Sequence, residues 1–486
     1  MDKLTLMLML GMATLVPLYA VVLTSNTAAL AVILTLALTP GLIEQLLGVP
    51  SVFPRAVMEL AIIMIFTKAL YLQVMKRGQR FKCVGLGPMM ALLGVSIISV
   101  ILNEQSYDSF LNFLRSAFLF YLFFLALLNL NLSEKTVRAV NGYLMLVFAF
   151  QIVPALIKFS QVGLQEGGGI GTVSVHAGEF STTLPLFAIA FLLAFYCLWR
   201  DRKYLLWIPV FITFGILGAK RALVFYVPIV LMFVYLIVPY GRQERGFSSP
   251  VRAGLRARKG LMALILISAV TLYTGFRLME ALNPDQTMWG SFDVGFALMT
   301  VYETETNVME EGGYFEKEQP APHSGAPLAT GRISSTLFSF RRLANEGILA
   351  LLLGSGPGFL TGSIFADVNV FETLRSVGIR YGLTGLVWFL NQVGILGALL
   401  FLLFYFQMFR KGLRVYRTIP SRYWKGVALG FLGASFVFVL DFVTYSVSTL
   451  TMGSLTAVYY YVAAACFSRL YRRETVSISS GTPSFG

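Results

Sequence analysis

Residues Thr384–Met408 read TGLVWFLNQVGILGALLFLLFYFQM, an unbroken run without Asp, Glu, Lys or Arg. A helix needs roughly 20 consecutive, mostly apolar residues to cross a bilayer. This segment meets that length, and the same test applied outward along the chain finds many more segments of its kind. The sequence therefore predicts an all-α polytopic membrane protein.

The test predicts twelve or thirteen transmembrane helices, because only Ser25-Asn26-Thr27 separates the first two segments. We interpret the first segment as a span and not as a signal peptide, since no convincing small-residue cleavage pattern follows it. The predicted spans are residues 4–24, 28–48, 57–75, 84–102, 110–131, 139–160, 181–198, 204–219, 222–240, 261–277, 384–408, 426–446 and 449–468.

Composition supports the membrane assignment and excludes other classes. Of the 486 residues, 57% are hydrophobic and 13% are charged, whereas a soluble chain carries about 25% charged residues. Soluble, secreted and fibrous classes are therefore excluded. The three cysteines, Cys83, Cys197 and Cys466, lie in or beside apolar segments, so no disulfide framework is expected.

The basic residues alternate along the chain in a way that sets an orientation. Six alternate connections hold 24 of the 38 Lys and Arg residues: 76–82, 135–138, 200–203, 242–259, 410–425 and 469–473. Cytoplasmic connections collect Lys and Arg, so we assign these six to the cytoplasm. The net charge of +14 then reflects membrane orientation, and no nucleic-acid partner is expected.

This orientation divides the chain into four regions. Residues 1–277 form an N-terminal bundle of predicted spans, 278–383 a large external (periplasmic) loop with short helices, 384–470 the C-terminal spans, and 471–486 a disordered cytoplasmic tail. The external loop holds twelve acidic residues and six basic ones. Loops of this length are usually functional.

Charged residues inside or beside apolar spans are costly and point to function. Arg115 lies inside an otherwise apolar segment, and both structural pairing and substrate contact stay open for it, with Asp441 as a possible pairing partner. Lys220 and Arg221 form a tight external turn between two spans. Positive charge is disfavoured on that side, so the turn predicts an anionic partner, with lipid headgroups as the alternative.

The external loop combines arginines with a glycine-rich turn. Backbone N–H groups of such a turn suit phosphate oxygens, and the planar arginine fork binds phosphate through two hydrogen bonds. We therefore expect a site for a lipid-linked diphosphate. A solvated helix face or headgroup contact remains open for Arg341 and Arg342, and a surface ion pair for Glu372 and Arg375. The relevant residues are Arg332, Arg341, Arg342, Gly354, Gly356, Gly358 and Arg375.

This constellation resembles the O-antigen ligase and polymerase superfamily of bacterial envelope glycan enzymes, over residues 160–390. The similar motifs are the basic turn with Arg221, Gly331-Arg332, the glycine-rich turn at 354–358 and Gly382-Leu-Thr-Gly385. The resemblance implies a GT-C-like glycosyltransferase architecture. Ligases of this family usually carry a histidine some residues before the last motif. Here that stretch has none, which favours the polymerase branch.

The resemblance implies polymerisation of undecaprenyl-diphosphate-linked oligosaccharide repeat units into O-antigen or exopolysaccharide, at the external face of the bacterial inner membrane. It implies metal-independent transfer without a cofactor, in which arginines stabilise the lipid diphosphate. Arg221, Arg332 and Glu372 are the expected catalytic residues, and Glu346 and Asp367 are reserve bases. The expected diphosphate-binding residues are Lys220, Arg115, Arg341, Arg342, Arg375, Gly354, Gly356 and Gly358.

The expected partners are the lipid-linked oligosaccharide, membrane lipids and, in the cell, a chain-length regulator and a flippase. Several alternative functions stay open. One is ligase-type transfer of glycan to a lipid or protein acceptor, and another is transfer from a lipid-phosphate sugar. A polysaccharide transporter or flippase is disfavoured because no internal sequence repeat is visible. A non-catalytic component of an envelope assembly complex is the last.

Overall fold

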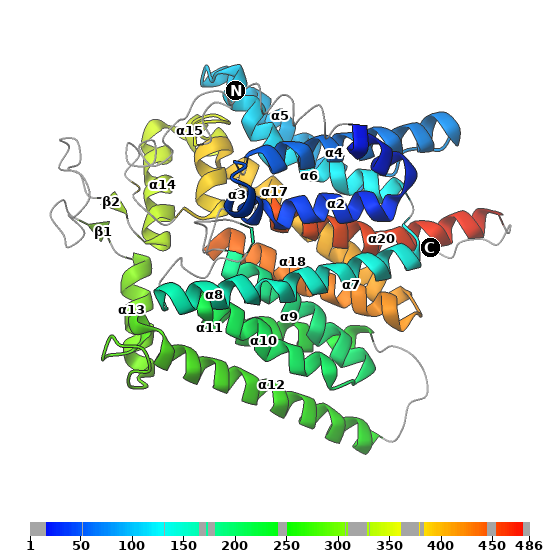
Figure 1. Ribbon diagram of the computed structural model, residues 1–486. Coiled ribbons are helices and arrows are strands. Elements are labelled where there is room, and N and C mark those ends of the chain that lie inside the picture. The colour runs from blue at the N-terminus through cyan, green and yellow to red at the C-terminus, as the bar shows by residue number, and fades with distance from the viewer. Residues whose placement is uncertain are drawn as a thin grey trace.

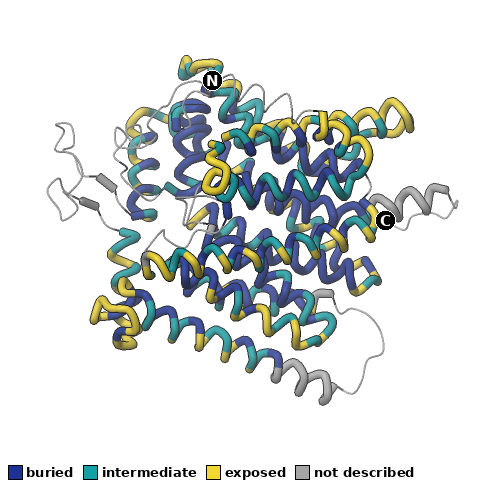
Figure 2. Tube along the Cα trace, viewed as in Figure 1, coloured by how far each residue is buried: buried dark blue, intermediate teal, exposed yellow. Residues whose placement is uncertain are grey.

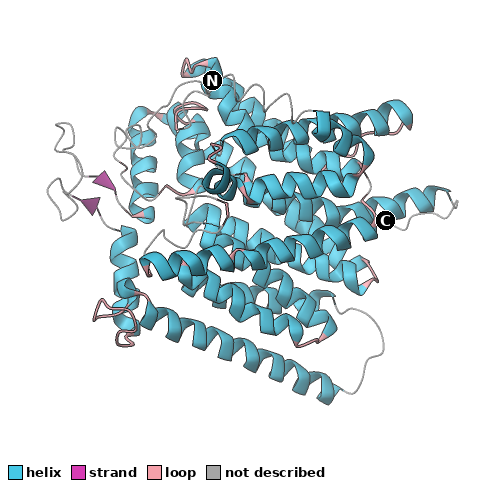
Figure 3. Cartoon of the chain, in the orientation of Figure 1, coloured by secondary structure: helices cyan, strands magenta, loops and turns pink. Residues whose placement is uncertain are grey.

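The computed structural model is almost entirely helical (Figure 3). It describes residues 16–50, 52–130, 132–164, 172–173, 180–241, 250–306, 308–309, 328–329, 331–360, 379, 383–444 and 453–479. Up to residue 241, its helices are α2 (Asn26–Leu38), α3 (Pro40–Leu47), α4 (Val52–Leu70), η1 (Tyr71–Lys76), α5 (Leu86–Leu102), α6 (Tyr107–Asn129), α7 (Glu134–Phe150), α8 (Ile152–Val162), α9 (Phe180–Trp199), α10 (Lys203–Leu217), α11 (Arg221–Ile237) and η2 (Val238–Gly241).

The second half contains a long helix, a set of short elements and three further long helices. Two short strands pair antiparallel, with Val308 opposite Ala329 and Met309 opposite Leu328. The elements are α12 (Pro250–Leu278), η3 (Glu280–Leu282), α13 (Val294–Thr306), β1 (Val308–Met309), β2 (Leu328–Ala329), α14 (Arg332–Glu346), α15 (Ile348–Leu353), α17 (Gly385–Thr418), α18 (Arg422–Thr444) and α20 (Ser454–Ser479).

The chain is a multi-pass membrane protein by the length and hydropathy of its helices. In the described ranges, seven helices are long and apolar enough to cross a bilayer, or eight if α2 and α3, bent by 70°, count as one span. Three shorter apolar helices, α5, α10 and α11, lie among them. The all-α membrane class is therefore confirmed, whereas the total of twelve or thirteen spans stays a prediction.

The connections sort to two ends of the helical bundle (Figure 1). The short elements α13, α14 and α15 gather at one end, which we call the α14 end. The stretches rich in Lys and Arg, at 76–82, 200–203 and 410–425, lie at the opposite end, which we call the basic end. The alternation of charge in the sequence thus corresponds to a separation of charge in space.

Close packing of α9 against α18 depends on glycines. Gly426 and Gly430, four residues apart, lie on one face of α18. A Cβ atom added at Gly430 would come within 2.3 Å of the Phe191 ring, and one at Gly433 within 2.8 Å of the Ala190 Cβ. Small residues at this spacing let membrane helices approach closely, because dispersion contacts hold helices together in lipid. The glycines of α18 therefore let α9 pack closely against it.

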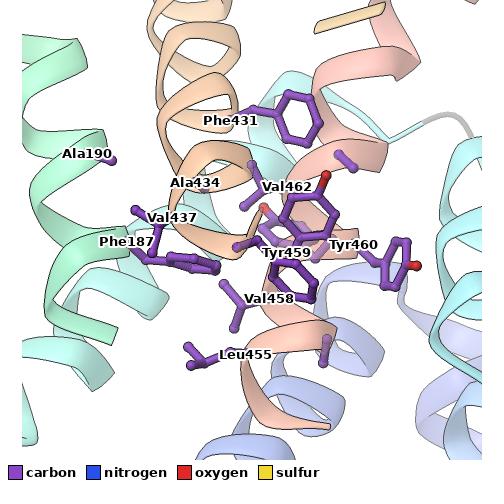
Figure 4. Packing of buried hydrophobic residues seen from close by; sticks show 14 of the residues in the cluster. Phe187, Ala190, Phe431, Ala434, Val437, Leu455, Val458, Tyr459, Tyr460 and Val462 are labelled. Atoms are coloured by element: carbon purple, nitrogen blue, oxygen red, sulfur yellow. The ribbon is translucent and has the colours of Figure 1, made fainter. Parts of the chain in front are cut away.

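Part of the buried interior of the bundle lies between α9, α18 and α20 (Figure 4). Phe187 of α9, Val437 of α18 and Val458 of α20 point toward one another there. Tyr459 and Tyr460 are almost fully buried in the same cluster. Burial decreases outward to α12, whose described side chains are mostly intermediate or exposed (Figure 2). An apolar surface that is exposed in this way suits lipid contact.

Helix α17 is broken near its start, and a loop docks into the break. Gly394 has non-helical backbone angles, φ 66° and ψ −167°. A Cβ atom there would lie 2.3 Å from the backbone of Leu352, so only glycine allows α15 to approach this closely. The N–H groups of Ser355 and Gly356 donate to the carbonyls of Asn391 and Gln392, at 2.8 and 3.2 Å. The break in α17 thus fixes the turn that follows α15.

Candidate functional site

A cavity of about 440 Å³ lies at the α14 end, between α11, α13, α14, α17 and α18. Its wall is largely apolar, with arginine, glutamate, threonine and tyrosine side chains set into it. Such a combination of apolar wall and few polar groups is typical of ligand sites. The lining residues are Arg221, Ala222, Phe225, Tyr226, Val301, Thr304, Glu305, Arg332, Ile333, Thr336, Leu337, Leu386, Val443 and Thr444.

Two of the predicted catalytic residues, Arg221 and Arg332, face this cavity together. They lie 111 positions apart in the sequence, and each is the first residue of a helix, α11 and α14 respectively. A helix N-terminus carries a partial positive charge, so cations there are unfavourable and anions favourable. Two arginines in this position therefore form a strongly electropositive pair of sites at one cavity.

Helix α13 holds both arginines in place. Arg332 forms an ion pair with Glu305, and its backbone N–H donates to the second Glu305 carboxylate oxygen at 3.2 Å. Arg221 donates from Nη1 to the Thr304 hydroxyl at 3.3 Å. A Cβ atom at Gly331 would lie 2.2 Å from the Glu305 carbonyl oxygen, so glycine permits this approach. The end of α13 is thereby clamped onto the start of α14.

The opposite wall contributes hydroxyl groups from helices that are distant in the sequence. Tyr226 of α11 and Thr444 at the end of α18 share a hydrogen bond of 2.6 Å. Both lie in the cavity wall with Arg332. The cavity thus offers two guanidinium groups, one carboxylate and several hydroxyl groups beside apolar side chains, an arrangement suited to an anion attached to a lipid.

Arg342, predicted to bind diphosphate, is bound within the protein. Its Nη2 donates to the Ser355 hydroxyl at 2.6 Å and to the Asn391 side-chain oxygen at 2.9 Å. Its Nη1 lies 3.2 Å from Glu346, and its guanidinium lies 5.2 Å from the centre of the Phe359 ring. Burial lowers the pKa of Arg342, and the Glu346 carboxylate opposes that shift. These contacts favour a structural role that ties α14 to α17.

The glycine-rich turn faces inward. Gly354, Gly356 and Gly358 are buried and have φ angles of 73°, 107° and 100°. The N–H of Gly358 donates to the Gln392 side-chain oxygen at 2.7 Å, and that of Gly356 to the Gln392 carbonyl. A phosphate would need those same donors. This geometry indicates that glycine is needed at these positions for close packing. The predicted contact of the three glycines with a diphosphate has no support in these hydrogen bonds.

Arg115 pairs with Glu59, and the proposed pairing with Asp441 is wrong. The Arg115 Nε lies 2.7 and 2.8 Å from the two Glu59 carboxylate oxygens. Asp441 instead accepts a hydrogen bond from Thr183 at 3.2 Å. The physical reason is packing: α6 lies against α4, whereas α18 lies against α9. Of the two roles left open for Arg115, this geometry favours structural pairing.

The remaining predicted residues are less informative. Lys220 is the N-cap of α11 beside the cavity but is not part of its wall. Arg341 is exposed on α14 and also lies outside that wall, so its predicted contact with the diphosphate has no support in this geometry. Glu372, Arg375 and Asp367 lie outside the described residues, so their roles stay predictions. Within the described ranges, no group of three or more His, Cys, Asp or Glu side chains lies together as a metal site requires.

Sequence reasoning missed Glu305 and its neighbour Thr304. Glu305 is one of many acidic residues in the predicted external loop, in the stretch Tyr302-Glu303-Thr304-Glu305. A usable signal existed, since Thr304 and Glu305 lie three and four positions after Val301 and share one face of a helix with it.

Comparison of the chain with models of known protein families and with curated proteins finds no match.

Proposed function

We propose that the protein polymerises undecaprenyl-diphosphate-linked oligosaccharide repeat units into O-antigen or exopolysaccharide. The observation that carries this proposal is the convergence of Arg221 and Arg332, each at a helix N-terminus, on one partly apolar cavity. Two cations suit a diphosphate, and the apolar wall suits the lipid chain attached to it. In this proposal the α14 end is the external side of a bacterial inner membrane.

The reaction requires the release of a lipid diphosphate. The acceptor sugar hydroxyl forms a new bond to the anomeric carbon of the donor, while the bond from that carbon to the diphosphate oxygen breaks. The electron pair of the broken bond leaves with the diphosphate. Arg221 and Arg332 stabilise this growing charge, and one well-placed donor of this kind contributes about 3–4 kcal/mol.

The proton of the acceptor hydroxyl needs a base. Glu305 lies in the cavity wall beside Arg332 and is the carboxylate of that wall. When Arg332 turns to the diphosphate, the Glu305 carboxylate becomes available to take the proton. Glu346, the earlier reserve base, is paired with Arg342 instead. Glu305 therefore joins Glu372 as a candidate base, and no metal or cofactor is required by this scheme.

The proposed reaction also implies an architecture and partners in the cell. A GT-C-like architecture with twelve or thirteen spans would hold the cavity at the external membrane surface, with a flippase delivering the donor and a chain-length regulator acting on the product. Ligase-type transfer to a lipid or protein acceptor and transport are the rival functions, and the products formed in the cell distinguish them.

The test is glycan profiling in the native cell, comparing a deletion strain with complementation by wild type, Arg221→Ala, Arg332→Ala and Arg341→Ala at matched membrane levels. Arg341 is the control, because it lies on the same helix as Arg332 but is exposed and outside the cavity wall. We expect the deletion to leave single lipid-linked repeat units, which wild type and the Arg341 variant convert to polymer.

The two cavity variants should not restore polymer. If the deletion still makes full-length polymer that stays unattached or undelivered, ligation or transport replaces polymerisation. If both cavity variants restore polymer as well as the Arg341 variant does, the cavity is not the active site.

A further inference from the structure

A second, larger hollow of about 620 Å³ opens between α7, α9 and α10. Its body is formed by apolar side chains such as Met145, Phe187 and Phe191, and by Gly142 of α7. A Cβ atom added at Gly142 would meet no atom within 4 Å, so the groove is open at that position. Leu146 and Trp207 beside it are 68% and 47% exposed. This is the shape and chemistry of a slot for a hydrocarbon chain.

The end of this groove nearest the basic end of the molecule is polar and aromatic. Trp199, Tyr204, Trp207 and Tyr423 surround it. Trp and Tyr gather at the depth where a bilayer meets water. The groove therefore runs from the membrane surface at the basic end toward the membrane interior, away from the cavity that holds Arg221 and Arg332.

The polar end also carries surplus positive charge. Arg138 donates to Glu134 at 2.7 Å, and Arg469 donates to the other oxygen of the same carboxylate at 2.8 Å. Two guanidinium groups thus share one carboxylate. The Arg138 guanidinium lies 3.9 Å from the centre of the Tyr423 ring, which holds it at the mouth of the groove. Among the described side chains, this cluster therefore has two guanidinium groups for one carboxylate, a balance of charge that suits an anionic ligand.

Lys203 supplies a second cation at the mouth. Its ammonium group lies 2.8 Å from Asp201, and the two side chains are 63% and 43% exposed. Ion pairs this exposed contribute little to stability, so a lipid phosphate can take the place of Asp201. Basic pockets between transmembrane helices at the cytoplasmic surface bind anionic lipid headgroups.

We infer that the groove between α7, α9 and α10 binds one anionic diacyl phospholipid, with its phosphate between Arg138 and Lys203 and an acyl chain along Gly142 and Phe191. The site is independent of the proposed glycosyl transfer, since it lies at the other end of the bundle. Bound lipid would fill the open part of the groove between α7, α9 and α10.

The test is native mass spectrometry of the purified full chain, titrated with phosphatidylglycerol or with phosphatidylcholine of the same acyl chains. We expect one phosphatidylglycerol to bind more tightly than phosphatidylcholine, by about five-fold for each basic residue that faces the headgroup. Arg138→Gln should lose about five-fold in affinity for phosphatidylglycerol and little for phosphatidylcholine.

Gly142→Leu should abolish the preference, because its side chain occupies the acyl-chain slot while suiting a helix better than glycine does. Gly94→Leu of α5 is the matched control, since that glycine also has open space around it but lies outside the groove. Equal binding of the two lipids to wild type would overturn the inference, as would unchanged preference in Gly142→Leu. Stronger binding of undecaprenyl phosphate than of phosphatidylglycerol would assign the groove to a polyprenyl chain and overturn it too.

Discussion

Two of the three arginines of helix α14, Arg332 and Arg342, lie ten residues apart and have sharply different surroundings. Arg332 begins the helix, pairs with Glu305 and faces a cavity of about 440 Å³. Arg342 lies near the other end of the helix and is surrounded by protein groups, with hydrogen bonds to Ser355 and Asn391. In the sequence both are cations of one predicted external loop, expected to act in catalysis and in diphosphate binding respectively. Their environments assign one to a ligand and the other to the fold.

The difference shows what makes an arginine available for catalysis. A guanidinium group next to a cavity can exchange a protein partner for a ligand. When a guanidinium group that joins two buried helices moves, the stability of the fold decreases. Arg332 also lies where the dipole of α14 disfavours a cation, and the Glu305 carboxylate offsets that cost until an anionic ligand is bound. Arg342 is far from that terminus and has a carboxylate, Glu346, beside it.

The largest effect that this comparison predicts concerns Arg332. In a reconstituted assay with a lipid-linked donor and acceptor, Arg332→Ala should lower the rate by about 10²–10³-fold, the usual loss for one donor that stabilises a leaving charge. Arg341→Ala, on the same helix but exposed, should retain the wild-type rate. Equal rates for both variants would show that the cavity-facing arginine has no special role.

The next effect tests the turn that anchors α14 through Arg342. Gly354→Ala should destabilise the fold by about 1–3 kcal/mol, because φ 73° strains an L residue. The added methyl group would also lie 2.6 Å from the backbone of Gln392, and such overpacking costs a further 1–3 kcal/mol, roughly.

Gly347→Ala is the matched control for Gly354→Ala. Gly347 also has a positive φ, 118°, but no atom lies within 4 Å of the added Cβ position. Gly347→Ala therefore introduces backbone strain as Gly354→Ala does, but it causes no steric overlap. The free energies of unfolding in mixed detergent micelles should rank wild type, Gly347→Ala and Gly354→Ala in decreasing order. Equal values for the two variants would mean that the turn does not press against α17.

Arg342 itself should affect stability more than chemistry. Arg342→Ala removes the donor that satisfies the buried Asn391 oxygen, and an unsatisfied buried acceptor costs about 1–3 kcal/mol. The melting temperature in detergent should fall, while the rate per folded molecule stays within a few-fold of wild type. A rate loss as large as that of Arg332→Ala, without a change in melting temperature, would return Arg342 to the active site.

The smallest effect concerns a second Arg–Glu pair, which resembles Arg332–Glu305 in burial but lines neither described cavity. The side chains of Arg115 and Glu59 are 36% and 22% exposed, and those of Arg332 and Glu305 are 30% and 21% exposed. A double-mutant cycle with Arg115→Met and Glu59→Gln should give a coupling of about 0.2–1 kcal/mol in unfolding free energy.

The transfer rate of each Arg115 or Glu59 variant should stay near that of wild type. A rate loss comparable to that of Arg332→Ala would place the α4–α6 pair in the reaction and would break the distinction between arginines that face a cavity and those that do not.

Much of the fold could be predicted from the sequence because the signal is local. The predicted span 181–198 corresponds to the apolar stretch Ser181–Trp199 of α9, and 261–277 to Gly260–Leu278 of α12. Length and hydropathy alone define such helices in a bilayer, where every backbone group must be bonded within the segment. The break in α17 is different, because Gly394 resembles any helix glycine until α15 is seen to pack against it.

The candidate site was only half visible in the sequence. Arg221 could be selected because cations are unusual on the predicted external side of a membrane protein, and Arg332 because Gly331-Arg332 resembles a motif of a known family. Glu305 gave no such signal in a loop rich in acidic residues, and the partner of Arg115 was sought in Asp441 when it is Glu59. Both failures have one cause, since the sequence does not say which helices are neighbours.

The sequence by itself determined a helical membrane protein, the approximate limits of its helices and the segregation of basic residues to alternate connections. These properties follow from hydropathy and charge along a single segment, and they require no knowledge of other segments. Only the tertiary structure decided that Arg221, Glu305 and Arg332 meet at one cavity while Arg342 holds α14 to α17. Such convergence depends on side-chain packing between helices far apart in the chain, which close-packed interiors fix and local sequence does not encode.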